Sequence, residues 1–393
     1  MRSTLFALGR ALLLALTFGL VSGLGGCGGS STTLDDGGAN QTSFAWWLRD
    51  GIPLPLEPAS NPMTEAKFQL GRHLFYDIRL SGNGTQSCAT CHHQDKAFTD
   101  GLTVAVGSTG DIHPRNSQTL TNVAYNATYT WANPALITIE AQMQTPLFSE
   151  HPVEQGINES NQDVVLQRIV DEPRYTELFA QAFPNQGSPV TFPNIIAAVA
   201  TFVRGLTSFN SPFDQFQLGN RSALSASAQR GQTLFFSEEL ECFHCHGGYN
   251  FSDSTVDRAI AFVERPFHNT GLYNIGGTGD FPSDNQGLFA ATGDPSDMGK
   301  FRAPTLRNIE LTAPYMHDGS ILTLDEVVDF YAAGGRNIES GEYAGDGRLN
   351  PFKDSFVNGF EITEQQKADL IAFLKSLTDQ EFISTERFSN PWE

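Results

Sequence analysis

The pattern Cys-x-x-Cys-His occurs twice in this chain, as Cys88-Ala-Thr-Cys91-His92 and as Cys242-Phe-His-Cys245-His246. This spacing places two thiols on one helical turn, where both can bond to the vinyl groups of one haem, and the adjacent histidine lies below the iron as an axial ligand. A thioredoxin-like redox pair does not need the histidine, and a zinc site would need further ligands nearby. We therefore expect two covalently bound haem c groups.

The start of the chain has the composition of an export signal. Basic residues flank an apolar run at residues 11–20 that is too short to span a bilayer. Cys27 follows small residues, as in a bacterial lipobox, and Gly28 after it favours the outer membrane of a Gram-negative cell. We expect a signal peptide at 1–26, then a flexible tether at 27–42 that begins with the lipidated Cys27. An ordinary signal peptide with an incidental cysteine is the alternative.

The composition of the 393 residues excludes several classes of protein. Hydrophobic residues make up 40% and aromatic residues 11%, which is typical of folded domains and not of disorder. The formal charge is -20, from 24 Lys and Arg against 44 Asp and Glu. Nucleic acid is therefore not an expected partner, because it requires clustered positive charge, and the membrane is expected to be contacted only through the lipid anchor.

A weak internal repeat accompanies the two motifs. Gly71-Arg-His-Leu-Phe75 precedes the first motif and Gly231-Gln-Thr-Leu-Phe235 precedes the second, each on a predicted helix with Thr64 or Ser225 as its N-cap. Strand-like alternation is scarce, whereas Gly and Pro are frequent. We therefore predict a mainly α fold with long structured loops, in which two cytochrome c-like domains, at 43–208 and 209–393, each hold one haem.

The haem motifs alone leave the function open. A c-type haem with both axial positions filled only carries electrons, whereas an open position permits catalysis. None of the five Met residues lies in a loop that clearly returns to a haem. A di-haem electron carrier with His and Met ligands is therefore not the obvious reading, although it stays as the non-enzymatic alternative.

Several longer motifs resemble one family. They are Leu70 to Asp77, Ala97 to Gly101, Arg115 to Ser117, Phe301 to Asn308 and Leu311 to Gly319. Together they are similar to the bacterial di-haem cytochrome c peroxidase and MauG superfamily. Segments at 130–134, 146–154, 267–274 and 381–392 resemble its MbnH-like enzymes.

This resemblance implies a periplasmic peroxidase-like oxidoreductase. Hydrogen peroxide would react at the N-terminal haem, and the C-terminal haem would transfer electrons. As in MauG and MbnH, both irons would reach Fe(IV), the bis-Fe(IV) state, and oxidise an aromatic side chain of a partner protein. The alternative enzyme is a cytochrome-c peroxidase that removes hydrogen peroxide with electrons from a small redox protein.

The resemblance also implies residues at the first haem. Gln142, Pro146 and Glu154 match the polar side of the peroxide pocket, where a carboxyl group with a raised pKa can act as both base and acid. Glu150 is the competitor of Glu154. Trp131 matches the tryptophan between the two haems, although simple aromatic packing would also explain it.

At the second haem, the resemblance implies that Tyr331 is the axial ligand opposite His246, as in MauG. Residues 324–331 have a helical pattern with a capping box of Thr323 and Glu326, and Tyr331 lies on its apolar face. From the helix alone, a core tyrosine with a hydrogen-bonded hydroxyl is the simpler interpretation. A phenolate would stabilise the higher oxidation states of iron.

The family also holds Ca²⁺ between its domains. The matching ligands are Asn116 through its side chain, with Thr312 and Pro314 through their carbonyls. Oxygen donors of this kind suit Ca²⁺.

Three other histidines are expected to have structural roles. His113 lies in roughly the loop where some peroxidases carry a histidine that blocks the haem, and we interpret it as ordinary loop structure. His268 and His317 lie in family motifs, and we interpret them as hydrogen-bonding residues near the second haem.

Overall fold

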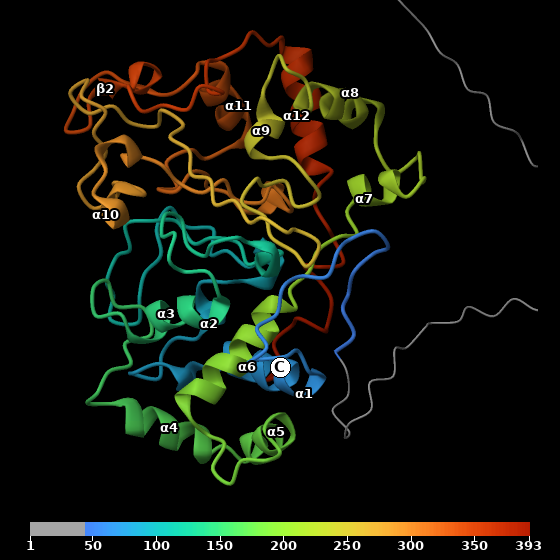
Figure 1. The fold of residues 1–393 in the computed structure, drawn as a ribbon, viewed down its shortest axis with the longest axis vertical. Helices are drawn as coiled ribbons and strands as arrows, with labels where there is room; N and C mark the ends of the chain where they lie inside the picture. Colours follow the sequence, from blue (N-terminus) through green and yellow to red (C-terminus); the bar gives the residue numbers. More distant parts are fainter. Residues whose placement is uncertain (1–43) are drawn as a thin grey trace, which may run out of the picture. The chain divides into compact units, whose positions relative to one another are not determined.

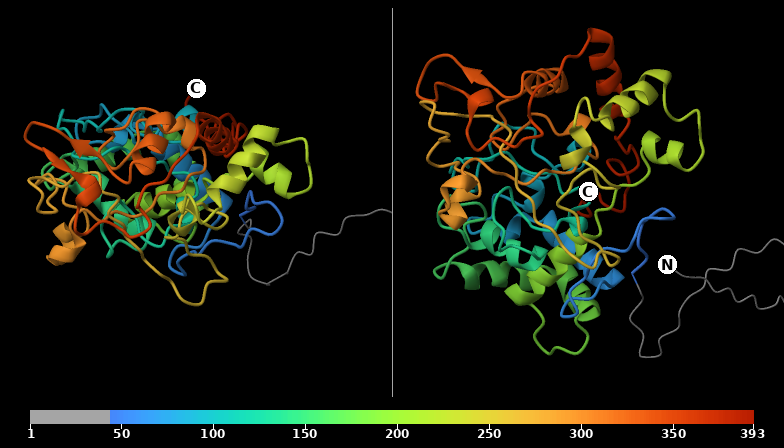
Figure 2. Two further views of the ribbon diagram at one scale, coloured as in Figure 1. Left: turned by 90° about the horizontal axis from the view of Figure 1, so that it is seen from above. Right: turned by 45° about the horizontal axis from the view of Figure 1, so that its top comes forward.

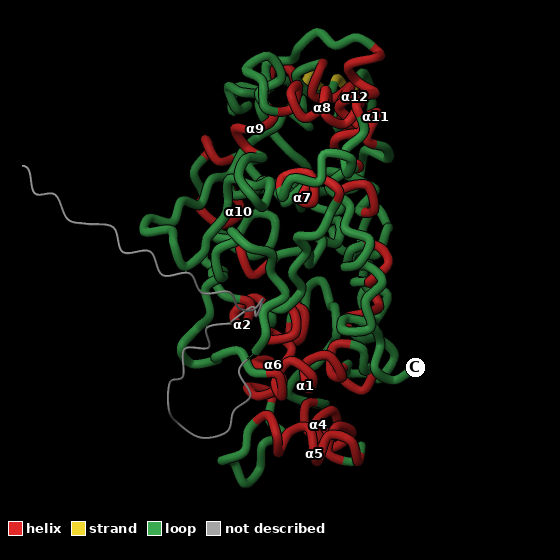
Figure 3. Tube along the Cα trace, turned by 90° about the vertical axis from the view of Figure 1, so that its right-hand side faces the viewer, coloured by secondary structure: helices red, strands yellow, loops and turns green. Residues whose placement is uncertain are grey.

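Short helices joined by long loops make up the computed structural model, which describes residues 44–393 (Figure 1, Figure 3). The helices are α1 (Glu65–Phe75), α2 (Ile139–Gln142), α3 (Gln144–Phe148), α4 (Gln162–Val170), α5 (Pro173–Ala182), α6 (Phe192–Arg204), α7 (Pro212–Gln217), α8 (Ala226–Phe235), α9 (Cys242–Cys245), α10 (Phe289–Thr292), α11 (Leu324–Ala332) and α12 (Glu364–Lys375). Within this part of the chain the strands are β1 (Asn337–Ile338) and β2 (Gly345–Asp346), an antiparallel pair with Asn337 opposite Asp346. The prediction of a mainly α fold with long loops is confirmed.

The signal peptide, Cys27 and the tether lie outside the described residues. Among residues 44–393, no helix is both long enough and apolar enough to cross a membrane.

The predicted helix starts are present. The Thr64 hydroxyl accepts a hydrogen bond from the Lys67 N–H at the start of α1, and the Ser225 hydroxyl accepts one from the Ala228 N–H at the start of α8. Thr323 and Glu326 form the predicted capping box of α11. Such caps satisfy N–H groups that have no partner within the helix, which explains why these boundaries could be predicted from local sequence.

Two glycines of the internal repeat permit two equivalent helix crossings. α1 crosses α6 at Gly71, where a Cβ atom would stand 1.9 Å from the Ala198 carbonyl oxygen. α8 crosses α12 at Gly231, where a Cβ atom would stand 1.9 Å from the Asp369 carbonyl oxygen. Only glycine fits at either crossing, because a methyl group would overlap the backbone of the partner helix.

The phenylalanines of the repeat also occupy equivalent places. The ring of Phe75 packs on Phe202 of α6 with centroids 5.1 Å apart, and the ring of Phe235 packs on Phe373 of α12 at 5.2 Å. The repeat therefore marks the same helix pair twice, once before each haem motif.

A methyl group at position 231 should destabilise the protein. We expect Gly231→Ala to lower the free energy of unfolding by about 1–3 kcal/mol, because the α8–α12 crossing would have to open. Gly187→Ala is the matched control, since a Cβ atom there would meet nothing within 4 Å, and it should change stability by about 0.5 kcal/mol or less. Urea unfolding of the haem-loaded protein measures both variants, and equal stabilities would contradict the crossing argument.

Two large hydrophobic clusters, and a small third one at Ala124, Tyr125 and Phe209, form the core of residues 44–393, which belong to one compact unit. The first cluster surrounds α1 and α6, and the second surrounds α8 and α12. However, the tail after α12 runs back to the first cluster, where Phe382 and Phe388 are fully buried and Phe382 packs on Phe98 at 5.5 Å (Figure 1, Figure 2). The clusters mix residues from both sides of position 209, because Ala132 packs in the second cluster and the tail packs in the first. The predicted domain boundary there stays a prediction.

A buried ion pair links distant segments near that boundary. Arg307 donates two hydrogen bonds to the carboxylate of Asp214, at 2.8 and 3.0 Å, and both side chains are fully buried. Arg49, in the segment before α1, lies 3.3 Å from the same carboxylate. The nearby guanidinium groups lower the pKa of Asp214, against the effect of burial. The pair therefore ties the segment before α1 and α7 to a loop of the second cluster.

Candidate haem sites

The first Cys-x-x-Cys-His motif borders a cavity of about 370 Å³. Cys88, Cys91 and His92 line it, and neither cysteine is in a disulfide. The imidazole Nδ1 of His92 hydrogen-bonds the Phe98 carbonyl at 2.7 Å. Because that carbonyl accepts a hydrogen bond from the Nδ1–H, the Nε2 atom carries a free lone pair, as an axial ligand requires.

The second motif has the same arrangement. Cys242 and Cys245 are the ends of α9, and with His246 they line a second, mainly apolar cavity of about 230 Å³. The Nδ1 atom of His246 hydrogen-bonds the Phe251 carbonyl at 3.2 Å, which again leaves Nε2 available. Two free thiols, one oriented imidazole and a cavity at each motif fit a covalently bound haem c.

The polar residues predicted for the peroxide pocket come together at the first cavity. Gln142 is the last residue of α2, Pro146 lies in α3, and Glu154 lies in the loop that follows, and all three line this cavity with His92. Glu150 is exposed and does not line it. Burial raises the pKa of Glu154, so this carboxyl group can exchange a proton closer to neutral pH than an ordinary glutamate. The geometry therefore favours Glu154 over Glu150.

Tyr331 lies in the second cavity, on the apolar face of α11. Leu324, Val327 and Val328 of the same helix also line that cavity. The Tyr331 hydroxyl makes no hydrogen bond to another described residue, whereas the buried hydroxyls of Tyr125 and Tyr175 donate to Pro53 and Asp77. The interpretation of Tyr331 as a core tyrosine requires a hydrogen-bond partner for its hydroxyl, and no described residue provides one. Burial raises the pKa of Tyr331, so a cation is needed to hold its phenolate form.

One segment forms a wall between the two cavities. Residues 116–119 line both, and the indole N–H of Trp131 donates a hydrogen bond of 2.9 Å to the Asn116 carbonyl. Trp131 itself lines the second cavity, while Tyr129, two residues earlier, lines the first. Trp131 thus lies against the wall that separates the two cavities.

The residues proposed for Ca²⁺ lie at the second cavity. Asn116, Thr312 and Pro314 all line it. The side-chain amide of Asn116 donates from Nδ2 to the Leu102 carbonyl at 2.7 Å, which leaves its Oδ1 as an oxygen donor.

Comparisons with known proteins agree with this geometry. The family model of the di-haem cytochrome c peroxidases matches residues 65–222. The cytochrome-c peroxidase IdrP1 of Denitromonas iodatirespirans is 36% identical over 341 residues, which cover 83% of this chain and 85% of that protein.

The chain belongs to the di-haem cytochrome c peroxidase family. The methylamine utilization protein MauG of Methylorubrum extorquens is 33% identical over 89% of both chains. A solved structure of a MauG-like protein associated with microbial copper homeostasis is 52% identical, with a TM-score of 0.88 over 89% of this chain and all of that one.

Membership of the di-haem cytochrome c peroxidase family implies two haem c groups and a haem peroxidase-type oxidoreductase. Both haem motifs of this chain have the residues for that chemistry. The family includes both peroxidases and MauG proteins, so membership leaves the mode of action to the residues of each cavity.

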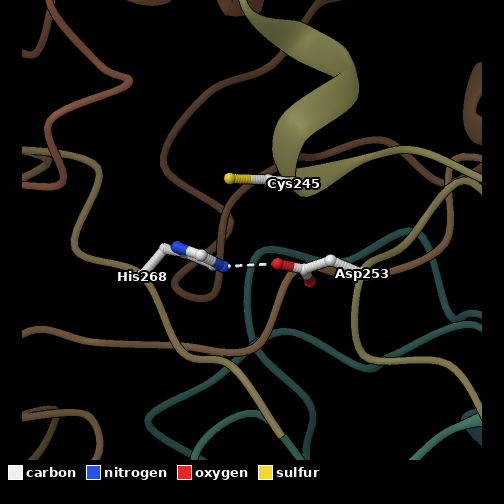
Figure 4. Close-up of side chains that lie close together, drawn as sticks. All are labelled: Cys245, Asp253 and His268. Carbon is white, nitrogen blue, oxygen red and sulfur yellow. Dashed lines mark hydrogen bonds and ion pairs between the residues drawn. The ribbon is translucent and has the colours of Figure 1, made fainter. Parts of the chain in front are cut away.

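His268 is a hydrogen-bonding residue near the second haem motif, as expected. Its Nε2 and Nδ1 atoms lie 2.7 Å from the carboxylates of Asp253 and Asp354. Burial alone would lower the pKa of His268, but these two hydrogen bonds raise it to about 12. Figure 4 shows Asp253 and His268 beside Cys245, so a charged group lies next to the predicted haem attachment.

His317 lies at the second cavity, where its ring is 5% exposed and stacks on Phe301 with centroids 3.6 Å apart. Burial lowers the pKa of His317 to about 3, so the ring is neutral. Its Nε2 atom has no partner among the described residues, and its role as a hydrogen-bonding residue near the second haem stays a prediction.

Sequence reasoning also missed two residues of the first cavity. His113 and Tyr129 both line it, although His113 was expected to be ordinary loop structure. Neither belongs to a recognisable local motif, and only contacts with distant segments bring them to the cavity. Two methionines also line cavities, Met143 the first and Met316 the second.

Proposed function

We propose that hydrogen peroxide reacts at the haem held by Cys88, Cys91 and His92, and that two oxidising equivalents then pass to a partner protein. The observation that carries this proposal is the group of Gln142, Pro146 and Glu154 around the cavity of His92. A haem that only carries electrons needs a second axial ligand there, not a carboxyl group with a raised pKa.

The residues of the first cavity have separate roles. When bound, the haem iron supplies the redox centre at which the peroxide O–O bond is cleaved. Glu154 accepts the first proton of the peroxide and returns it to the leaving oxygen, which departs as water. Gln142 donates a hydrogen bond to the oxygen that stays, and Pro146, which has no N–H, closes the wall without competing for it.

The residues at the second cavity determine what happens to the oxidising equivalents. Trp131, at the wall between the cavities, provides a path for electrons. Tyr331 and His246 line the same cavity, so Tyr331 would supply a phenolate to the second haem, and such a hard anionic donor favours the higher oxidation states of iron. We therefore favour the MauG-like mode, in which both equivalents are stored until an aromatic side chain of a partner docks and loses two electrons. The relative associated with copper homeostasis suggests proteins of that process as the first partners to test.

We also propose a Ca²⁺ site and a cellular location for the protein. Asn116, Thr312 and Pro314 would hold Ca²⁺ beside the wall that both cavities share, where it would fix residues 116–119. The export signal and Cys27 support a periplasmic protein, anchored by lipid to the outer membrane.

Stoichiometric peroxide added to the haem-loaded protein distinguishes the possible functions. In the MauG-like mode, one equivalent of peroxide is consumed and the oxidised optical spectrum persists until an aromatic partner is added. In a cytochrome-c peroxidase, the spectrum returns at once when a reduced small cytochrome or copper protein is present, and turnover continues. An electron carrier leaves both the peroxide and the spectrum unchanged, which would exclude the proposal.

A further inference from the structure

A short hairpin covers one side of the first cavity. Its backbone is held by hydrogen bonds from the His113 N–H to the Ala105 carbonyl and from the Gly107 N–H to the Asp111 carbonyl, both 2.9 Å long. The hairpin is joined to the loop of Glu154, because the Ser108 N–H donates to the Glu154 carbonyl at 2.8 Å. Asp111 accepts a hydrogen bond of 3.1 Å from the Val153 N–H. These contacts fix the two segments against each other.

The imidazole of His113 lies between this hairpin and the Glu154 carboxylate. Its Nδ1 atom is 3.8 Å from Oε1 of Glu154, and its Nε2 atom is 3.4 Å from the Val153 carbonyl. The His113 side chain is 12% exposed. Both side chains line the first cavity, so the imidazole is the basic side chain that forms an ion pair with Glu154.

We propose that His113 is a positioning residue for the peroxide reaction, which holds the Glu154 carboxylate at the cavity and sets the pH at which this carboxylate can act as a base. The proposal rests on the proposed function of Glu154. It adds a second residue, from a different segment of the chain, to the peroxide site.

The electrostatic reason follows from the distance between the two groups. Burial favours the protonated form of Glu154, and the charge of His113 acts in the opposite direction. When the His113 imidazole, 3.8 Å away, carries a proton, its charge stabilises the carboxylate. Without that charge the carboxyl group of Glu154 keeps its proton to a higher pH. At acidic pH, fewer protein molecules then have an ionised Glu154 that can accept a proton.

The other charged groups near this pair are Asp111, His151, Arg115 and Glu150. Asp111 is held by the Val153 N–H, which lowers its pKa, and the charges of His151 and His113 act on it in the same direction. His151 also lines the cavity. Arg115 lines the cavity, but its guanidinium donates to Asn285 at 2.8 Å and lies over the ring of Phe301. Glu150 is exposed outside the cavity. His113 is therefore the group best placed to change the proton affinity of Glu154.

His113→Gln tests this proposal, because glutamine keeps the polarity and loses the charge. The rate constant for the reaction with peroxide is measured by stopped flow across pH. We expect the acid limb of the profile to move to higher pH by about one unit, which is roughly a tenfold loss on the acid side and little loss on the alkaline side. His73→Gln is the control, since His73 lies on α1 and does not line the cavity, and its profile should match the wild type.

A second measurement does not depend on activity. Infrared difference spectra of the resting haem-loaded protein follow the carboxyl band of Glu154 through a pH titration, and Glu154→Gln assigns that band. We expect the band to titrate at higher pH in His113→Gln than in the wild type.

The outcomes separate the inference from the proposed function. An unchanged infrared titration, or a loss of rate that is equal at every pH, overturns the role of His113. A change in the iron coordination of the resting first haem in His113→Gln would instead identify His113 as an iron ligand, and would also overturn it. If the infrared shift occurs but the wild-type protein does not react with peroxide, His113 controls the protonation of Glu154 but the proposed function fails.

Discussion

Glu154→Gln should slow the reaction of the haem-loaded protein with hydrogen peroxide by about 100- to 10,000-fold, which is the usual contribution of a positioned acid–base group. Glutamine keeps the size of the side chain at the first cavity but cannot accept the peroxide proton. The wild-type rate should rise with pH as Glu154 ionises. The midpoint of this rise should lie at a higher pH than for an ordinary glutamate, because burial raises the pKa of Glu154. In the variant the rise should disappear. Stopped-flow optical measurements across pH check both expectations.

Glu150→Gln is the matched control, because Glu150 lies four residues away and is exposed outside the cavity. Its rate and pH profile should equal those of the wild type. If Glu150→Gln causes the loss and Glu154→Gln does not, the acid–base group has been assigned to the wrong glutamate.

Tyr331→Met should raise the reduction potential of the second haem by some tenths of a volt, within the roughly 0.8 V that axial ligands span. A thioether does not stabilise the higher oxidation states of iron as a phenolate does. The variant should still consume peroxide at the first cavity, but it should no longer store the second oxidising equivalent or oxidise the partner. Spectroelectrochemical titration gives the potential, and Mössbauer spectra after one equivalent of peroxide report the state of both irons.

Two further variants identify the ligand. Tyr331→Phe should change the low-spin spectrum of the second haem, because the ring remains and the oxygen donor is lost. Met316 lines the same cavity and is the competing donor. A spectrum that changes in Met316→Leu and not in Tyr331→Phe would make Tyr331 a core residue and remove the main support for the MauG-like mode.

Much of the candidate site depends on residues that are near one another in sequence. The two thiols and the histidine of each haem motif lie within five residues, so their spacing alone indicates the attachment. The face of α11 that carries Tyr331 follows from the helical repeat, and its capping box fixes where the helix begins. The internal repeat indicated a duplicated structure, although the sequence did not show that Gly71 and Gly231 are needed for backbone contact with α6 and α12.

The two haem motifs, the helix starts and the mainly α class can be predicted from sequence, because they depend on contacts between residues a few positions apart. The packing of the whole unit places Glu154 and not Glu150 at the first cavity, His113 beside it, and the tail against the first cluster. These features join segments that are tens to hundreds of residues apart, and their positions depend on how the long loops pack. No local periodicity encodes such packing, since each loop is held by hydrogen bonds and burial that exist only once the whole unit is folded.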